Sequence, residues 1–184
     1  MSTSQNGYDV ISASETFRWD LPLGSEPKRH LILKPGDAGF VLAVFALWYH
    51  ERVEKINLGI WDEWGWANRP IRGSSVISNH ASGTAIDLNA TKHPLGVRGT
   101  LRFLLTWRKS KKELAEQRIR RALSEQFDDV IRAGLNFTGR PDEMHYEIVR
   151  EFPEVSALAK QLRKTSRGKR VMRANPGYRP GIPR

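Results

Sequence analysis

Hydrophobic side chains recur at helical spacing in two long stretches of the chain. In the first, apolar residues three or four positions apart mark one face: Phe40, Val41, Val44, Leu47, Trp48 and Val53. With Asp37 as N-cap after Pro35 and Gly36, this pattern predicts a helix that reaches about residue 56. In the second stretch, the apolar face comprises Leu114, Ile119, Ala122, Leu123, Phe127, Val130 and Ile131. It predicts a helix over residues 111–133 that stops at Gly134.

Shorter patterns indicate strands between and after these helices. Residues 85–89 alternate between apolar and polar side chains, and residues 144–149 form a second short strand after a loop at 136–141. Residues 154–164 can form a last helix. These patterns by themselves predict a mixed α and β fold.

The chain divides most simply into an N-terminal segment, residues 1–28, a domain, residues 29–164, and a tail, residues 165–184. The tail is rich in Lys and Arg, contains no acidic residue, and has Pro and Gly scattered through its second half. Such a composition is typical of a flexible basic tail.

Composition narrows the possible chemistry. With 184 residues and no cysteine, the chain can bury a core of its own but cannot build a disulfide, a thiolate zinc site or an iron–sulfur cluster. The longest apolar stretch, residues 38–49, is shorter than the roughly 20 residues that span a bilayer, so no transmembrane segment is expected. The net charge of +10 predicts attraction to a polyanion. Because no nucleic-acid-binding motif accompanies the basic residues, no nucleic-acid partner is expected.

Two short segments carry residues that suit a metal site. His80 and Asp87 lie seven positions apart, and a turn at Gly83 would bring them together. Late in the chain, His145 follows Asp142 by three positions. Two imidazoles and one carboxylate are ligands that Zn²⁺ accepts, and three protein ligands leave the fourth tetrahedral position open, as in catalytic sites.

Hydrolysis at such a centre also needs a general base, and Asp142 is the better candidate. In an extended strand, residues an odd number apart point to opposite faces. Asp142 therefore reaches the side of His145 only if the chain bends near Glu143 or Met144. From this geometry alone, Glu143 and Glu147 remain alternative bases.

These segments resemble the signature of a known family. Ser-x-His-x-x-Gly-x-Ala-x-Asp at residues 78–87 and Asp-x-x-His at residues 142–145 are similar to the motifs of zinc D-Ala-D-Ala carboxypeptidases and L-alanyl-D-glutamate endopeptidases. That family includes the vancomycin-resistance dipeptidases and many phage endolysins. The resemblance extends from about residue 33 to residue 149. The sequence around the motifs is similar to that of phage-type and actinobacterial members: it reads Arg-Pro-Ile-Arg-Gly at residues 69–73 and Asp-Glu-Met-His-Tyr-Glu at residues 142–147.

The resemblance implies a role for each motif residue. His80, Asp87 and His145 would be the zinc ligands. Asp142 would be the base, and the chain would follow the Asp variant of a position that is Glu in many relatives.

The resemblance also implies a pocket and a fold. Ser78 would line the substrate pocket, and an upstream arginine, Arg72 or Arg69, would polarise the substrate carbonyl or bind a carboxylate. The fold would be α+β of the hedgehog or D-Ala-D-Ala peptidase type. A small, mainly antiparallel sheet would carry the zinc site, with helices packed on one side.

The expected function is that of a monomeric zinc metallopeptidase that cuts the peptidoglycan stem peptide, as an L-alanyl-D-glutamate endopeptidase of the endolysin type. One alternative is a D-Ala-D-Ala carboxypeptidase or dipeptidase of a bacterial host. Another is a non-catalytic zinc module that binds cell wall or nucleic acid. Because the first residues lack a signal-peptide pattern, we expect synthesis in the host cytoplasm and action on the wall after holin-type release. The basic tail would bind anionic wall polymers.

The other histidines and the tryptophans favour structural roles. Surface or packing roles are expected for His30, His50 and His93. The six tryptophans could form a sugar-stacking platform, with Trp61 and Trp64 among those just before the first motif, but most are expected to pack in the core or in a pocket wall.

Overall fold

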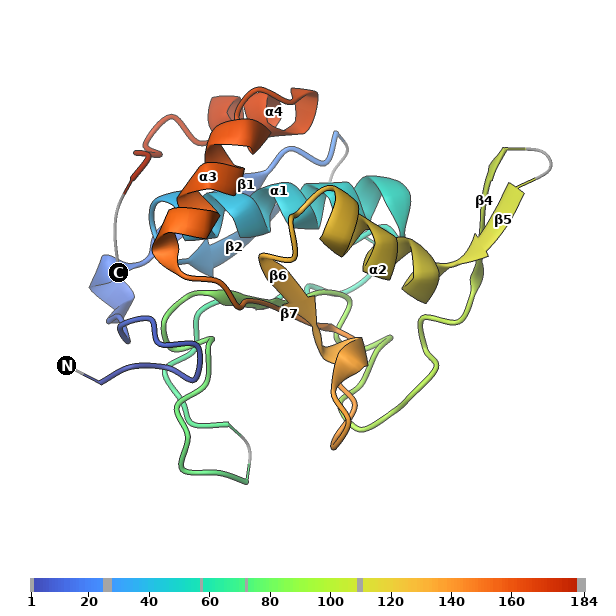
Figure 1. Cartoon of the computed structure of the whole chain (residues 1–184), viewed down its shortest axis with the longest axis horizontal. Coiled ribbons are helices and arrows are strands. Elements are labelled where there is room, and N and C mark those ends of the chain that lie inside the picture. Colours follow the sequence, from blue (N-terminus) through green and yellow to red (C-terminus); the bar gives the residue numbers. More distant parts are fainter. Residues whose placement is uncertain (1, 25–27, 57, 72, 109–110, 182–184) are drawn as a thin grey trace.

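A buried helix forms the centre of the molecule (Figure 1). The computed structural model describes residues 2–24, 28–56, 58–71, 73–108 and 111–181. Helix α1, Asp37–Arg52, is buried on every side from Asp37 to His50, because α3, α4 and strand β1 all pack against it. The predicted helix is confirmed, although its N-cap is Gly36 and it ends at Arg52.

Small antiparallel sheets surround this helix. Strands β1, Phe17–Leu21, and β2, Arg29–Leu33, form one hairpin. Strands β3, Ala85–Asp87, β7, His145–Ile148, and β6, Ile131–Ala133, form a three-stranded sheet with β7 in the middle. The α+β class with small antiparallel sheets is therefore confirmed, and β3 and β7 lie within the two predicted strands.

The helix predicted over residues 111–133 is wrong at both ends. Its first residues form β5, Lys111–Leu114, which pairs with β4, Leu104–Arg108. Helix α2 covers only Ala115–Glu125, and a turn then leads into β6. Asp128 and Asp129 have φ of 49° and 52°, left-handed values that stop a helix. The apolar residues of the pattern are thus divided among β5, α2 and β6 with the turn before it, and do not lie on one helix.

The predicted flexible tail is also wrong, because its first part is folded. Helix α3, Phe152–Leu162, is followed by helix α4, Ser166–Ala174, whose N-cap Thr165 accepts a hydrogen bond from Gly168 N. After α4, Tyr178 is buried and stacks on Phe40 with ring centroids 4.9 Å apart. Its hydroxyl donates to Asp37 Oδ1 at 2.7 Å. A single aromatic residue that packs against a distant helix produces no periodic pattern, so the sequence contains no indication of this contact.

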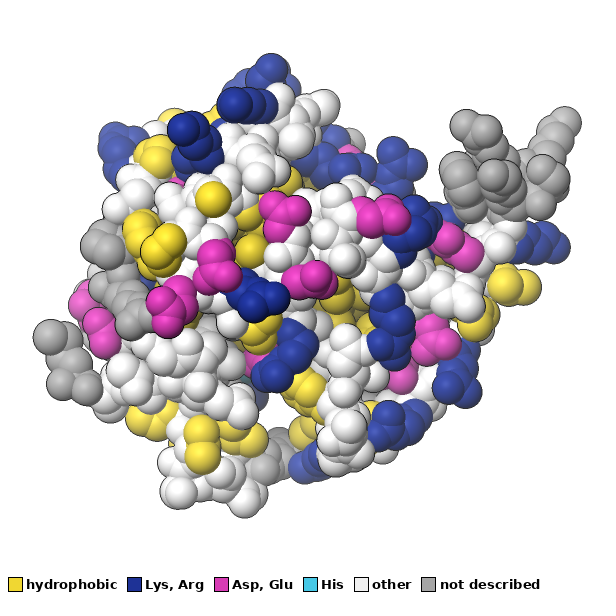
Figure 2. All heavy atoms as spheres, viewed as in Figure 1, with side chains coloured by type: hydrophobic (Ala, Val, Ile, Leu, Met, Phe, Trp, Pro, Cys, Tyr) yellow, Lys and Arg dark blue, Asp and Glu magenta, His cyan; other side chains and the backbone are white. Residues whose placement is uncertain are grey.

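The exposed side of α4 is strongly basic. Lys and Arg side chains gather over α4 at the top of the space-filling view and again beside α2 (Figure 2). Two short 3-10 turns, Ala13–Glu15 and Gly134–Asn136, complete the described elements. Within the part of the chain that the structure describes, no helix combines the length and apolarity needed to cross a membrane.

Candidate metal centre

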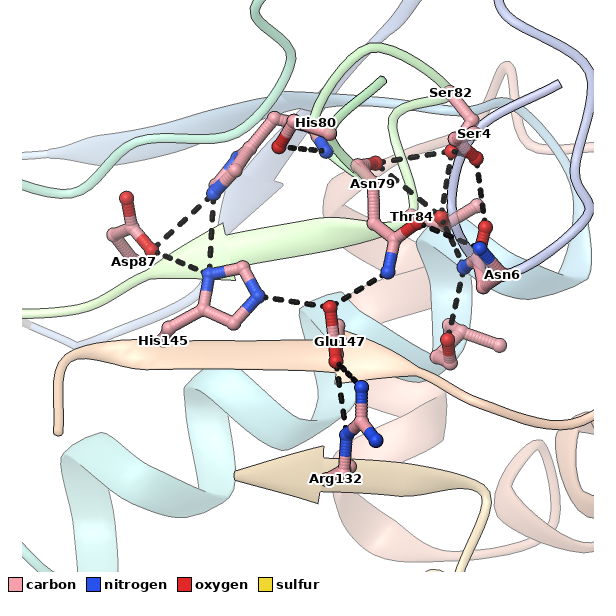
Figure 3. Close-up of polar contacts among 12 residues, drawn as sticks. Ser4, Asn6, Asn79, His80, Ser82, Thr84, Asp87, Arg132, His145 and Glu147 are labelled. Atoms are coloured by element: carbon pink, nitrogen blue, oxygen red, sulfur yellow. Dashed lines mark hydrogen bonds and ion pairs between the residues drawn. The ribbon is translucent and has the colours of Figure 1, made fainter. Parts of the chain in front are cut away.

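The pairing of β3 with β7 brings two of the predicted ligands together. Asp87 lies directly opposite His145 in this antiparallel pair. Directly opposed residues of antiparallel strands have their side chains on the same face of the sheet. The sheet register thus places a carboxylate beside an imidazole (Figure 3).

The loop before β3 brings His80 to the same place. It turns at Gly83, which has φ +67° and accepts a hydrogen bond from Lys34 N at 2.9 Å. A Cβ atom at this position would lie 2.4 Å from Lys34 N, so only glycine fits. The predicted turn at Gly83 is confirmed, and the glycine of the first motif has a steric reason.

Three ligand atoms converge at this point. His80 Nε2 lies 3.2 Å from His145 Nδ1 and 3.3 Å from Asp87 Oδ1, and the last two atoms are 2.9 Å apart. Ligand atoms around a tetrahedral zinc ion, at about 2.0–2.2 Å from it, lie roughly 3.3–3.6 Å from one another. The three side chains are buried. The donor types are those that zinc accepts, and the observed separations of 2.9–3.3 Å lie at or a few tenths of an ångström below the range for tetrahedral zinc.

Contacts on the far side of each ring select the ligand nitrogen. His80 Nδ1 lies 2.6 Å from the carbonyl oxygen of Gly65, and His145 Nε2 lies 3.0 Å from Glu147 Oε2. When the far-side nitrogen of a neutral ring donates its proton to such an acceptor, the other nitrogen has a free lone pair. Nε2 of His80 and Nδ1 of His145 are the atoms that face the centre.

The charges around the centre favour a cation. Burial lowers the pKa of His145, but the carboxylates of Asp87 and Glu147 outweigh it and raise this pKa to about 10. Burial raises the pKa of Asp87, yet His80 and His145 hold it well below its ordinary value. A site that stabilises both an imidazolium and a carboxylate can exchange the proton's positive charge for that of a metal ion.

Asp142 enters the same pocket through a bend in the chain. Residues 143 and 144 form a turn in which His145 N donates to Asp142 O at 3.2 Å. The chain passes so close to Gly134 that a Cβ there would lie 2.2 Å from Asp142 O. Oδ1 of Asp142 is buried and accepts no hydrogen bond from the described residues. Burial raises the pKa of this carboxyl to about 6.

The two alternative bases are engaged elsewhere. Glu143 accepts hydrogen bonds from Gly99 N at 2.7 Å and Leu101 N at 3.0 Å, so it anchors a neighbouring loop. Glu147 is held by His145 and by Arg132. Of these three candidate bases, Asp142 is the one with an oxygen that accepts no hydrogen bond from the described residues.

The ligand atoms open onto a pocket of about 550 Å³, a volume suited to a small ligand or peptide segment. Ser78 lines it, and its Oγ accepts from His80 N at 3.3 Å. Arg69 and Arg140 also line it, and neither has an acidic partner among the described residues. Arg72, the other arginine predicted for the substrate carbonyl, lies outside the described residues.

Comparison with known proteins points to the same chemistry. Residues 72–148 match the family model described as D-alanyl-D-alanine carboxypeptidase. The match includes His80, Asp87, Asp142 and His145. It supports a hydrolase of the zinc carboxypeptidase family, and the His-Asp-His group could hold the metal. No curated protein and no solved structure matches the chain.

Sequence reasoning missed several residues of this site. Arg132 and Phe137 line the pocket, and Arg132 lies over the Phe137 ring at 5.1 Å from its centroid. Arg132 donates to Glu147 because β6 places the two residues opposite each other. Gln5 of the N-terminal segment lines the pocket as well. No motif includes Arg132 or Gln5, since only strand register and chain packing bring them in.

The remaining histidines and several tryptophans make packing or hydrogen-bond contacts away from the pocket. His50 and His93 are buried, at 3% and 2% exposure, and His30 packs on Trp61. Trp66 donates from Nε1 to Ile11 O, whereas Trp64 is half exposed. None of them lines the pocket.

Proposed function

We propose that this chain is a zinc peptidase that hydrolyses a peptide bond in the bacterial peptidoglycan stem peptide, as an L-alanyl-D-glutamate endopeptidase of the endolysin type. One observation carries the proposal. The three buried ligand residues and Asp142 line the same pocket, and Oδ1 of Asp142 accepts no hydrogen bond from the described residues. A structural zinc site would have four protein ligands and no open side.

His80, Asp87 and His145 would hold the zinc. When bound, zinc would supply a Lewis acid that polarises the scissile carbonyl and makes a water molecule more acidic. Asp142 would accept the proton of that water on its carboxylate and pass it to the leaving amine. Burial raises the pKa of this carboxyl, which makes it a stronger proton acceptor.

Arg69 and Arg140 support an acidic substrate. They line the pocket without acidic partners among the described residues. Guanidinium groups bind carboxylates with two parallel hydrogen bonds, and the stem peptide carries carboxylates next to the bonds that such peptidases cut. Arg69 thus takes the substrate-binding role in this proposal.

The alternative activity is removal of a terminal D-Ala from a D-Ala-D-Ala end. The description of the matching family favours it. The third possibility, a zinc module without catalysis, gains no support from a free carboxylate at the pocket. For localisation, we propose synthesis in a host cytoplasm and action on the wall after holin-type release. The basic surface of α4 would contact anionic wall polymers.

Digestion of purified peptidoglycan tests the proposal. The zinc-loaded protein, the same protein with a chelator, and an Asp142→Asn variant would be compared by mass spectrometry of the released fragments. We expect fragments with a new D-glutamate or D-isoglutamine N-terminus from the zinc-loaded protein alone. Release of free D-Ala would establish the carboxypeptidase instead, and no product with zinc bound would contradict both peptidase activities.

A further inference from the structure

The N-terminal segment, residues 2–11, lies along the loop that carries His80. Gln5 N donates to Ile77 O at 3.0 Å, and Ile11 N donates to Ala81 O at 3.1 Å. A third bond, 2.8 Å long, joins the hydroxyls of Ser4 and Ser82. The family match begins only at residue 72, so these contacts come from outside the matched region.

Asn6 is the centre of this contact. Its main-chain N–H donates to Asn79 Oδ1 at 2.9 Å, and its side-chain Nδ2 donates to Thr84 Oγ1 at 2.8 Å and to Ile148 O at 2.9 Å (Figure 3). The amide of Asn6 thereby joins the loop before β3 to the end of β7. Because the oxygen of Asn79 accepts from Asn6, the amino group of Asn79 must point the other way.

That amino group reaches the carboxylate behind His145. Asn79 Nδ2 donates to Glu147 Oε2 at 2.6 Å, and the same oxygen accepts from His145 Nε2 at 3.0 Å. Arg132 Nε binds the other oxygen of Glu147 at 2.9 Å. Glu147 is only 2% exposed, so solvent does not replace these partners. The carboxylate is held from two sides, and its orientation sets that of the imidazole.

We propose that Asn6 is a positioning residue of the metal centre. Through Asn79 and Glu147 it holds the ring of His145 with Nδ1 towards Asp87. The N-terminal segment is then a part of the metal site. This inference rests on the metal site of the proposed function and is independent of the peptide bond that is cut.

The expected effect follows from the order of the contacts. Loss of a partner that orients a metal ligand lowers metal affinity by about 10- to 100-fold. Asn6→Ala removes the two side-chain bonds to Thr84 and Ile148 but keeps the main-chain N–H that binds Asn79. The main chain at residue 6 is then no longer fixed from the side-chain end, and we expect zinc affinity to fall by about tenfold. Asn79→Ala should weaken it at least as much. Because the two residues act in series, the double variant should bind zinc no more weakly than Asn79→Ala alone.

Zinc affinity would be measured by competition with a chromophoric chelator, and ligand geometry by the visible absorption spectrum of the cobalt-loaded protein. Thr3→Ala is the matched control, because Thr3 is an exposed residue of the same segment whose pairing with Asp9 uses only the main chain. It should keep the wild-type affinity and spectrum. Asn6→Ala should change both the zinc affinity and the cobalt spectrum. A loss of stability alone would leave these two properties unchanged in the protein that remains folded.

A folded Asn6→Ala protein with wild-type zinc affinity and cobalt spectrum would overturn the inference and leave the proposed function intact. Should Asn6→Ala not fold, Asn6→Ser removes the same amide donors but keeps a small polar side chain, and the same two results decide. A wild-type protein that binds no zinc would overturn both the inference and the proposed function.

Discussion

His145 and His93 are both buried and both have a carboxylate partner, but only His145 belongs to the candidate metal centre. His145 lies between Asp87 and Glu147, and its Nδ1 also faces His80. His93 lies 3.0 Å from Glu54 Oε2 through Nε2 and 2.9 Å from Thr100 Oγ1 through Nδ1. Both of its ring nitrogens are occupied, and it does not line the pocket.

The difference shows what distinguishes a metal site from a structural polar cluster. Burial and a carboxylate partner are common to both histidines. At the candidate metal centre, two further features are present: three ligand atoms lie close together, and the site opens onto a pocket. The cluster of Glu54, His93 and Thr100 instead continues to Glu143, whose Oε2 accepts from Thr100 Oγ1 at 2.5 Å. It supports the chain just before His145 without facing the substrate.

The largest effect is expected from removing a ligand. His145→Ala or His80→Ala should lower zinc affinity by on the order of a thousandfold and abolish turnover, because two ligands do not hold the ion against solvent. Metal content after dialysis and peptidoglycan digestion would measure both losses. Stoichiometric zinc in either variant would contradict the ligand assignment.

Removing the base should separate catalysis from metal binding. Asp142→Ala should lower kcat by about 10²- to 10⁴-fold, the usual contribution of a general base, while zinc affinity stays close to wild type. Steady-state kinetics on a soluble stem peptide and chelator competition would be run on the same preparation. Equal zinc loss in Asp142→Ala and His145→Ala would mean that Asp142 is a ligand or a structural residue.

Removing His93 should have the opposite effect to removing a metal ligand: it should lower stability and leave zinc binding unchanged. His93→Ala leaves Glu54 and Thr100 without their partner, so we expect the free energy of unfolding to fall by about 2–3 kcal/mol. Zinc affinity should remain close to wild type. Urea unfolding of the zinc-free protein would give the first value and chelator competition the second. A large loss of zinc by this variant would mean that the cluster around His93 also contributes to metal binding, contrary to a purely structural role.

A smaller, pH-dependent effect is expected at Glu54. Burial raises the pKa of this carboxyl, but His93 and Lys92 outweigh it and lower the pKa to about 2. A lowered pKa in the folded state contributes stability above the ordinary value near 4.5, and this stability is lost as pH falls towards 2. Glu54→Gln should therefore lose about 2 kcal/mol less than wild type between pH 6 and pH 3. Urea unfolding at both pH values in a chelator would test it, and identical pH dependence in the two proteins would exclude this role.

The motif residues were predictable because their chemistry is local. The Gly83 turn and the bend before His145 could both be stated in advance, because a left-handed glycine and an odd residue spacing have direct geometric consequences. The helix over 111–133 and the flexible tail failed for a different reason. Periodicity records which residues are apolar, whereas pairing of β5 with β4 and anchoring of Tyr178 on Phe40 depend on distant partners.

By itself, the sequence determined the types of the candidate ligands, their order along the chain, the buried helix and the mixture of helices and strands, since each depends on residue chemistry or short-range spacing; the α+β class came from the family resemblance. Tertiary structure alone decided which of the three candidate bases has an oxygen that accepts no hydrogen bond from the described residues. It also decided that Arg132 supports Glu147, and that Asn6 reaches the metal centre through Asn79. The physical reason is that hydrogen bonds between residues far apart in sequence require a folded chain to bring donor and acceptor within about 3 Å.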